Sequence, residues 1–100
     1  MLILNIIYSK KQFNIYSAGK GYIVHNTDKP FVNGHTHISN YNTAKFIIDL
    51  CLNNSKPNHL SKYLLVSLTR ISTNDKYIDD INLLLKNKNN RKQSYRNTRM

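Results

Sequence analysis

The chain has 100 residues, 40% of them hydrophobic, and 15 Lys and Arg against 5 acidic residues give a formal net charge of +10. This length allows one small domain, and the hydrophobic share excludes an intrinsically disordered chain. A single cysteine excludes a disulfide framework and metal sites built from several cysteines. No apolar run is long enough to span a membrane. We therefore expect a protein of the cytoplasm, or of the host cytoplasm if a phage encodes it.

The basic excess is larger than codon bias explains. Asn, Lys, Ile and Tyr supply 44 residues, which indicates an A/T-rich gene and accounts for part of the lysine content. Glutamate codons also tolerate A/T richness, yet the chain contains no Glu. Losing one acidic residue type while basic residues stay abundant indicates an anionic partner.

The first quarter of the chain predicts three β-strands. Residues 2–8 form a short segment rich in β-branched side chains. Residues 13–16 alternate apolar and polar side chains, as a half-buried strand does. Residues 18–21 (Ala-Gly-Lys-Gly) predict a tight hairpin, and residues 22–25 return as the third strand. An antiparallel meander is therefore expected.

Residues 27–42 predict a long irregular loop, because Asp28, Pro30 and Asn33-Gly34 are turn-forming residues. A loop of this length is a candidate functional site. His35 and His37 would share one face if their segment were extended. No third ligand is identifiable for a metal, so we predict no metal site there. A metal-free nuclease that uses histidine as general acid and base stays open as an alternative.

The second half predicts three helices. Ala44, Ile47, Ile48 and Cys51 share one helical face after an Asn cap at 40 or 42, and Cys51 is expected to be inert core. A second helix is expected to have Pro57 in its first turn and to bury one stripe, widened by Tyr63 and Val66: Leu60, Leu64, Leu68 and Ile71. The third helix follows a cap at residues 72–75, and its apolar face consists of Tyr77, Ile78, Ile81, Leu84 and Leu85. Strands followed by helices predict an α+β fold, β-β-β-α-α-α, over residues 1–85.

Residues 86–100 predict a basic C-terminal arm without an apolar period. It holds Lys86, Lys88, Arg91, Lys92, Arg96 and Arg99, with Tyr95 available to stack on a base. Three of the four arginines in the chain lie there, and the guanidinium group binds phosphate in bidentate fashion. On the body, Lys10, Lys11 and Lys20 lie at predicted turns among tyrosines. A solvated terminus without a binding role remains the alternative for the arm.

These features predict a small, non-enzymatic nucleic-acid-binding protein that prefers RNA to DNA and needs no cofactor. One alternative is a phage or mobile-element inhibitor of the anti-CRISPR type, which binds and blocks a nucleic-acid-guided defence complex. Another is a component of a ribonucleoprotein, including an organellar ribosome. A helix-turn-helix formed by the last two helices is disfavoured, because Asp75, Asp79 and Asp80 would face phosphates.

Overall fold

The computed structural model describes residues 5–57 and 59–98, with side chains described as far as residue 87. Four strands precede three helices: β1 (Asn5–Lys10), β2 (Phe13–Ala18), β3 (Gly21–Asn26), β4 (His35–Ile38), α1 (Tyr41–Asn53), α2 (Lys62–Ile71) and α3 (Asp75–Thr98). The α+β class and the order of strands before helices are confirmed, whereas the expectation of three strands is wrong.

The four strands form one antiparallel meander in the order β1-β2-β3-β4. Two-residue connections join the first three strands, with Lys11 (φ 54°) and Gly19 (φ 60°) in the left-handed conformation that such tight turns need. A bulge between Ile6 and Tyr8 shifts the register of β1 against β2. Consecutive turns lie at opposite ends of a meander, so Lys11 and Lys20 are placed at opposite ends of this sheet.

The fourth strand lies inside the segment predicted as a loop. β4 pairs with β3 from Tyr22 opposite Ile38 to His25 opposite His35, so the irregular connection shrinks to residues 27–34. Four residues give too short an alternation to be recognised among the surrounding Asn, Gly and Pro. Pairing with β3 makes this segment a strand.

The helix caps explain where α1 and α2 begin. The Asn40 side chain accepts a hydrogen bond from the Thr43 backbone N–H, as an N-cap does. Ser61 accepts in the same way from Leu64, so α2 begins five residues after Pro57 and the predicted start is wrong. The buried face of α2 also differs from the prediction, since Leu65 is buried whereas Tyr63 and Val66 are exposed.

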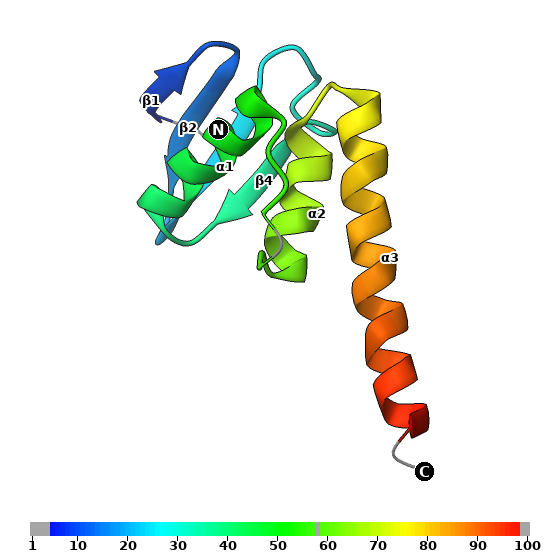
Figure 1. The fold of residues 1–100 in the computed structure, drawn as a ribbon. Coiled ribbons are helices and arrows are strands. Elements are labelled where there is room, and N and C mark those ends of the chain that lie inside the picture. The colour runs from blue at the N-terminus through cyan, green and yellow to red at the C-terminus, as the bar shows by residue number, and fades with distance from the viewer. Residues whose placement is uncertain (1–4, 58, 99–100) are drawn as a thin grey trace.

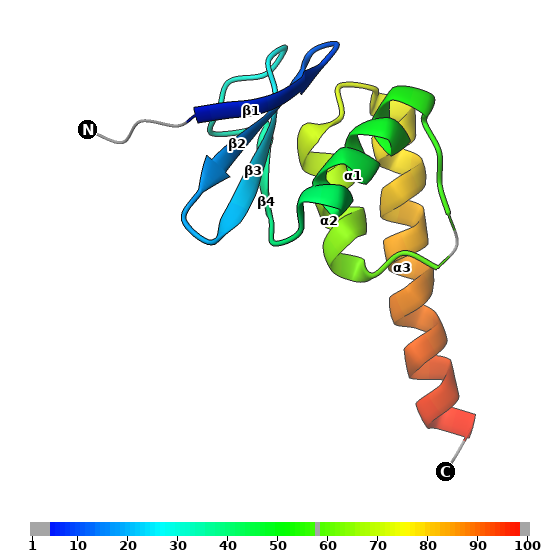
Figure 2. The same ribbon diagram turned by 90° about the vertical axis from the view of Figure 1, so that its left-hand side faces the viewer.

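Helices α1 and α2 cover one face of the sheet, and α3 packs against α2 (Figure 1 and Figure 2). The core lies between the two layers, and its fully buried members include Phe13, Ile15, Val24, Ala44, Ile47, Ile48, Leu65, Leu68, Ile71 and Ile81. Within residues 5–57 and 59–98, no helix covers the opposite face, as the edge-on view in Figure 2 shows. The fold therefore leaves one face of the sheet open.

Helix α3 does not end where the arm was predicted to begin. It continues to Thr98, a length of about 36 Å, and its C-terminal half projects beyond α2 in Figure 1. The side chains of Lys88, Arg91, Lys92, Tyr95 and Arg96, and the whole of Arg99, lie outside the described part of the structure. No helix in that part combines the length and apolarity of a membrane span.

Candidate nucleic-acid interface

Five rings gather on the open face of the sheet. Strand alternation places Tyr16 of β2, His25 of β3, and His35 and His37 of β4 on this face, and the loop before β4 adds Phe31. The Phe31 ring is stacked on the His35 imidazole at a centroid distance of 4.3 Å and an interplanar angle of 8°. We call Tyr16, His25, Phe31, His35 and His37 the ring cluster.

The rings form a continuous chain of contacts. Phe31 meets His25 edge-on at 5.2 Å and Tyr16 at 6.4 Å, while His35 meets His37 at 5.2 Å. These centroid distances fall within the range of aromatic contacts. Phe31 and His37 are exposed, and the other three rings are partly exposed. The cluster is therefore a packed surface of rings that solvent still reaches.

Hydrogen bonds to the loop backbone orient two of the imidazoles. His25 Nε2 lies 2.9 Å from the Lys29 carbonyl oxygen, and His35 Nδ1 lies 2.5 Å from that of Phe31. Since a carbonyl only accepts, each of these nitrogens carries the proton in the neutral ring. In that neutral tautomer of His35, Nε2 is the nitrogen without a proton. The corresponding His25 Nδ1 is buried and has no hydrogen-bond partner among the described atoms.

The loop that carries Phe31 is fastened to the end of α2. Asn26, fully buried, donates from Nδ2 to the Ile71 carbonyl at 2.8 Å and accepts from the Asp28 backbone N–H. Lys29 Nζ donates to the carbonyls of Arg70 and Ser72 at the C-terminal end of α2. These bonds hold the loop in one position. They also engage the Lys29 ammonium group with backbone carbonyls of the protein itself.

The close packing of this loop also requires a glycine. A Cβ atom at Gly34 would lie 2.5 Å from the Lys29 Cβ, closer than two carbon atoms can approach. Gly34 is buried, and its carbonyl accepts from the Asn26 backbone N–H at 3.0 Å. The Asn33-Gly34 pair, which the sequence marks as a turn, thus closes the loop just before β4 begins.

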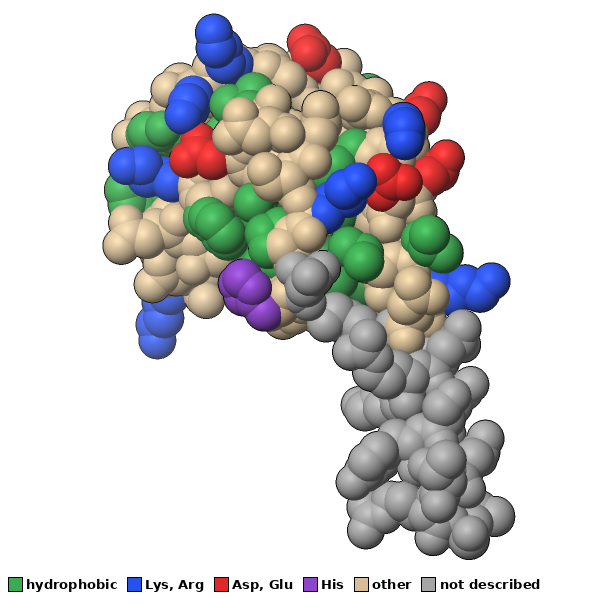
Figure 3. Space-filling model, viewed as in Figure 1, with side chains coloured by type: hydrophobic (Ala, Val, Ile, Leu, Met, Phe, Trp, Pro, Cys, Tyr) green, Lys and Arg blue, Asp and Glu red, His purple; other side chains and the backbone are tan. Residues whose placement is uncertain are grey.

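Acidic side chains are concentrated on the helical layer. Asp49 belongs to α1, and Asp75, Asp79 and Asp80 belong to α3, so Asp28 is the one acid of the chain outside the helices. Figure 3 shows acidic side chains gathered over the first turns of α3. The sheet layer therefore carries a surplus of positive charge.

Three lysines are engaged in ion pairs or cation–π contacts within the protein. Lys10 Nζ lies 2.7 Å from Asp49 Oδ1, and this bond raises the pKa of the lysine. Lys45 Nζ lies 5.0 Å from the Tyr8 ring centroid and 5.5 Å from that of Tyr41, within cation–π range. Lys56 Nζ lies 2.9 Å from Asp80 Oδ2. The charges of Lys10, Lys45 and Lys56 are therefore engaged in contacts within the protein.

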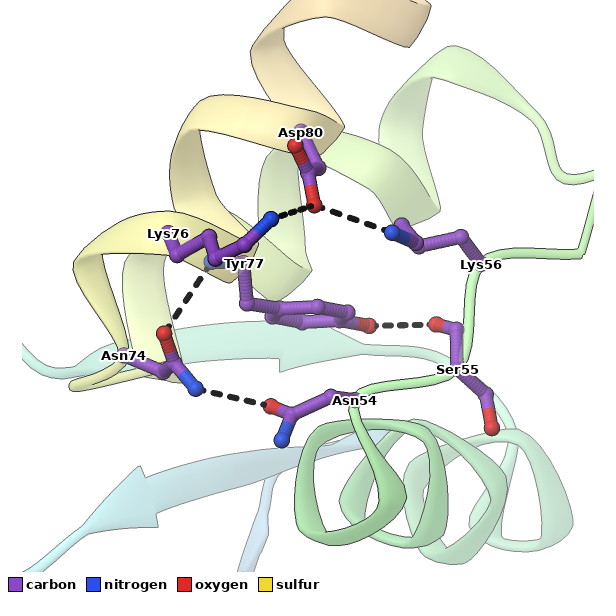
Figure 4. A network of polar contacts seen from close by, with 7 residues as sticks. All are labelled: Asn54, Ser55, Lys56, Asn74, Lys76, Tyr77 and Asp80. Carbon is purple, nitrogen blue, oxygen red and sulfur yellow. Dashed lines mark hydrogen bonds and ion pairs between the residues drawn. The ribbon is translucent and has the colours of Figure 1, made fainter.

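Figure 4 shows a network of polar contacts at the start of α3, and this network has a structural role. The Asn74 side chain caps α3 by accepting from the Tyr77 backbone N–H, and it donates to Asn54 of the α1–α2 connection. The Tyr77 hydroxyl donates to the Ser55 carbonyl at 2.7 Å, and burial raises the pKa of Tyr77. This network fastens the start of α3 to the connection that follows α1.

The sequence-predicted binding residues are divided by the fold. Lys11 and Lys20 are exposed in the hairpin turns and Lys86 is exposed on α3. Lys10 faces α1, and the remaining residues of the predicted arm lie outside the described side chains. The expectation that His35 and His37 share a face is confirmed, since both belong to β4. Phe31 was missed, because no local pattern indicates that a loop phenylalanine stacks on a strand histidine.

The sequence predicts that the single cysteine is inert and that the chain has no metal site. Cys51 is buried in α1, and burial raises the pKa of its thiol to about 12, which agrees with the prediction of inert core. Within residues 5–57 and 59–98, no three His, Cys, Asp or Glu side chains come close enough to share a metal ion.

Comparison with known proteins finds no matching family model and no significant match among curated proteins or solved structures.

Proposed function

We propose that this protein binds single-stranded nucleic acid, RNA in preference to DNA, and does so without catalysing a reaction. The observation that carries the proposal is the Phe31–His35 stack, 4.3 Å apart and uncovered by any helix, at the centre of the ring cluster. Every base has a π-face, so exposed aromatic rings on a sheet bind unpaired bases with little dependence on sequence.

The distribution of charge supports the same partner. Lys11 and Lys20 stand at opposite ends of the sheet, and no described acidic side chain forms an ion pair with either of them. A strand of nucleic acid lying across the ring cluster would have a cation near each end of its path. The basic residues of α3 from Lys86 onward would add phosphate contacts, which strengthen binding without selecting a sequence.

The open face also favours single strands over duplexes. Bases in a duplex are stacked on one another, so their faces are unavailable to a protein ring unless the duplex opens. A flat sheet face offers no helix to enter a major groove. Binding of a duplex would therefore rest on phosphate contacts alone and be weaker and more salt-dependent.

A matched pair of phenylalanines tests the proposal. Phe31 is 39% exposed in the ring cluster and Phe46 is 42% exposed on α1, on the other side of the molecule. Phe31→Ala should weaken binding to a labelled oligouridylate by roughly 5- to 150-fold, the loss that removal of one base–aromatic stack produces. Phe46→Ala should leave the affinity unchanged, and equal melting temperatures would show that both variants fold.

Three results would redirect the proposal. Equal affinities of the two variants would remove the ring cluster from the interface. Absence of binding to RNA and DNA at low salt would favour the inhibitor alternative, in which an acidic protein face is the partner. Shortening of the labelled RNA during incubation, lost in His35→Ala, would favour the metal-free nuclease.

A further inference from the structure

We infer a pocket for one unpaired nucleobase at the end of the sheet, beside the ring cluster. The inference rests on the proposed function and specifies where one base of the bound strand goes. The pocket has a volume of about 310 Å³ and is lined by the end of β2, the start of β3, the end of β4 and the first turn of α2, with these residues: Ala18, Gly21, Tyr22, His37, Ile38, Ser39 and Tyr63.

The aromatic walls of the pocket are held in place. The Tyr63 hydroxyl donates a hydrogen bond to the His37 backbone carbonyl, which fixes the ring over the free edge of β4 although the side chain is 58% exposed. The Tyr22 ring packs against Tyr41 at a centroid distance of 5.6 Å. A ring that is already held loses little conformational entropy when a ligand stacks on it.

The size and the polar groups of the pocket suit a single base. Small-molecule sites begin at roughly 300 Å³, so this pocket accommodates one heterocycle and not a larger ligand. The Ser39 hydroxyl and the His37 imidazole supply hydrogen-bonding groups for the polar edge of a base, and neither forms a side-chain hydrogen bond within the described residues. No acidic side chain lines the pocket.

The position of the pocket connects it with the proposed binding face. His37 belongs to both, because its ring meets His35 of the ring cluster and the residue is also part of the pocket lining. Lys20 follows the lining residue Ala18 by two positions, and Lys62 immediately precedes Tyr63; both lysines are exposed. A strand that crosses the ring cluster can therefore turn one base into the pocket while its phosphates remain near these two cations.

The test uses a fluorescent base in the full-length protein, which contains no tryptophan. A short oligouridylate carrying one 2-aminopurine, and separately the free 2-aminopurine riboside, would be titrated with protein while fluorescence quenching is followed. Tyr63→Ala should weaken quenching and lower the affinity for the oligonucleotide by roughly 5- to 150-fold. The slope of log affinity against log salt should stay unchanged, because a stack releases no counterions.

Three variants control the result. Val66→Ala, an exposed residue of the same helix outside the pocket, should bind as the parent protein does. Tyr63→Phe keeps the ring and should retain most of the quenching. Ser39→Leu fills the pocket from an exposed position and should exclude the riboside even if Tyr63→Ala fails to fold.

Two outcomes separate the pocket from the proposed function. Equal quenching by the parent protein, Tyr63→Ala and Ser39→Leu, with oligonucleotide binding still dependent on Phe31, would overturn the pocket and leave the function standing. Quenching of the riboside that Ser39→Leu abolishes, without any binding of oligonucleotides, would support the pocket and overturn the function.

Discussion

The two faces of the sheet are made by the same strands and differ in what they bury. On the inner face Phe13, Ile15 and Val24 pack against the helices and exclude water. On the outer face the rings pack against one another and the loop before β4, and the aliphatic side chain of Ile23 is also buried there, since it is 5% exposed and pairs with Tyr16 and His37. Side chains that alternate along a strand therefore divide into those that stabilise the fold and those that remain available for a ligand.

Two isoleucines of the sheet make the comparison quantitative. Ile15 on β2 is 0% exposed on the inner face, whereas Ile6 on β1 is 55% exposed and opposes Tyr16 on the outer face. Ile15→Ala should lower the free energy of unfolding by about 2–5 kcal/mol, through lost burial and the cavity left behind. Ile6→Ala should change it by about 0.5 kcal/mol or less.

Denaturant unfolding of both variants measures this difference. Ile81→Ala in α3, also fully buried, should behave as Ile15→Ala does. Similar losses at Ile6 and Ile15 would mean that the outer face is covered in solution, for example by a second copy of the chain.

The next largest effect is expected from removing the hydrogen bonds that fasten the loop to α2. Asn26→Ala leaves the buried Ile71 carbonyl and the partly buried Asp28 N–H without their partner, at a cost of about 1–3 kcal/mol. The variant should also release Phe31 from His35 and weaken RNA binding. Asn33→Ala, an exposed residue of the same loop, is the control and should alter neither property. Retention of full RNA affinity by Asn26→Ala would show that the interface does not depend on this anchoring.

Removing the basic residues 86–100 shows how much they contribute to the salt dependence of binding compared with residues 1–85. Each phosphate contact to a single strand contributes about 0.7 to the slope of log affinity against log salt. If half of the six basic residues of residues 86–100 make contacts, a chain ending at residue 85 should show a slope smaller by about 2. Titrations at several salt concentrations measure this slope, and the melting temperature is the control. Identical slopes would confine the interface to the sheet face.

The smallest expected effect concerns the acidic start of α3. The hydrogen bond from Lys56 holds the pKa of Asp80 below its ordinary value of 3.8, although burial acts against it. Because the pKa is lower in the folded state, the ion pair stabilises the protein above pH 3.8, and this contribution is lost as the pH falls through the folded-state value. Asp80→Asn should therefore lower the melting temperature slightly at pH 7, and the difference should shrink as the pH falls below 3.8. A difference that does not change with pH would assign the effect to something other than charge.

Local patterns determined much of this molecule. The alternation of residues 13–16, the spacing of Ala44, Ile47, Ile48 and Cys51, and the caps around residues 40 and 72–75 all act within a few positions along the chain. The sequence therefore predicted the α+β class and most element positions. It also indicated that His35 and His37 would share one face if their segment were extended, because positions i and i+2 of a strand point to the same side.

Contacts between distant segments decided the rest. β4 is a strand because β3 supplies its hydrogen bonds. The elements that pack against α2, and not its own residue pattern, determine that it buries Leu65 and leaves Tyr63 exposed. The ring cluster depends on Asn26 and Lys29 reaching the end of α2, more than 40 positions away, to fix the loop that carries Phe31. Such pairings leave no periodic trace in the sequence, because neither segment alone encodes its partner; only the folded chain brings Phe31 onto His35.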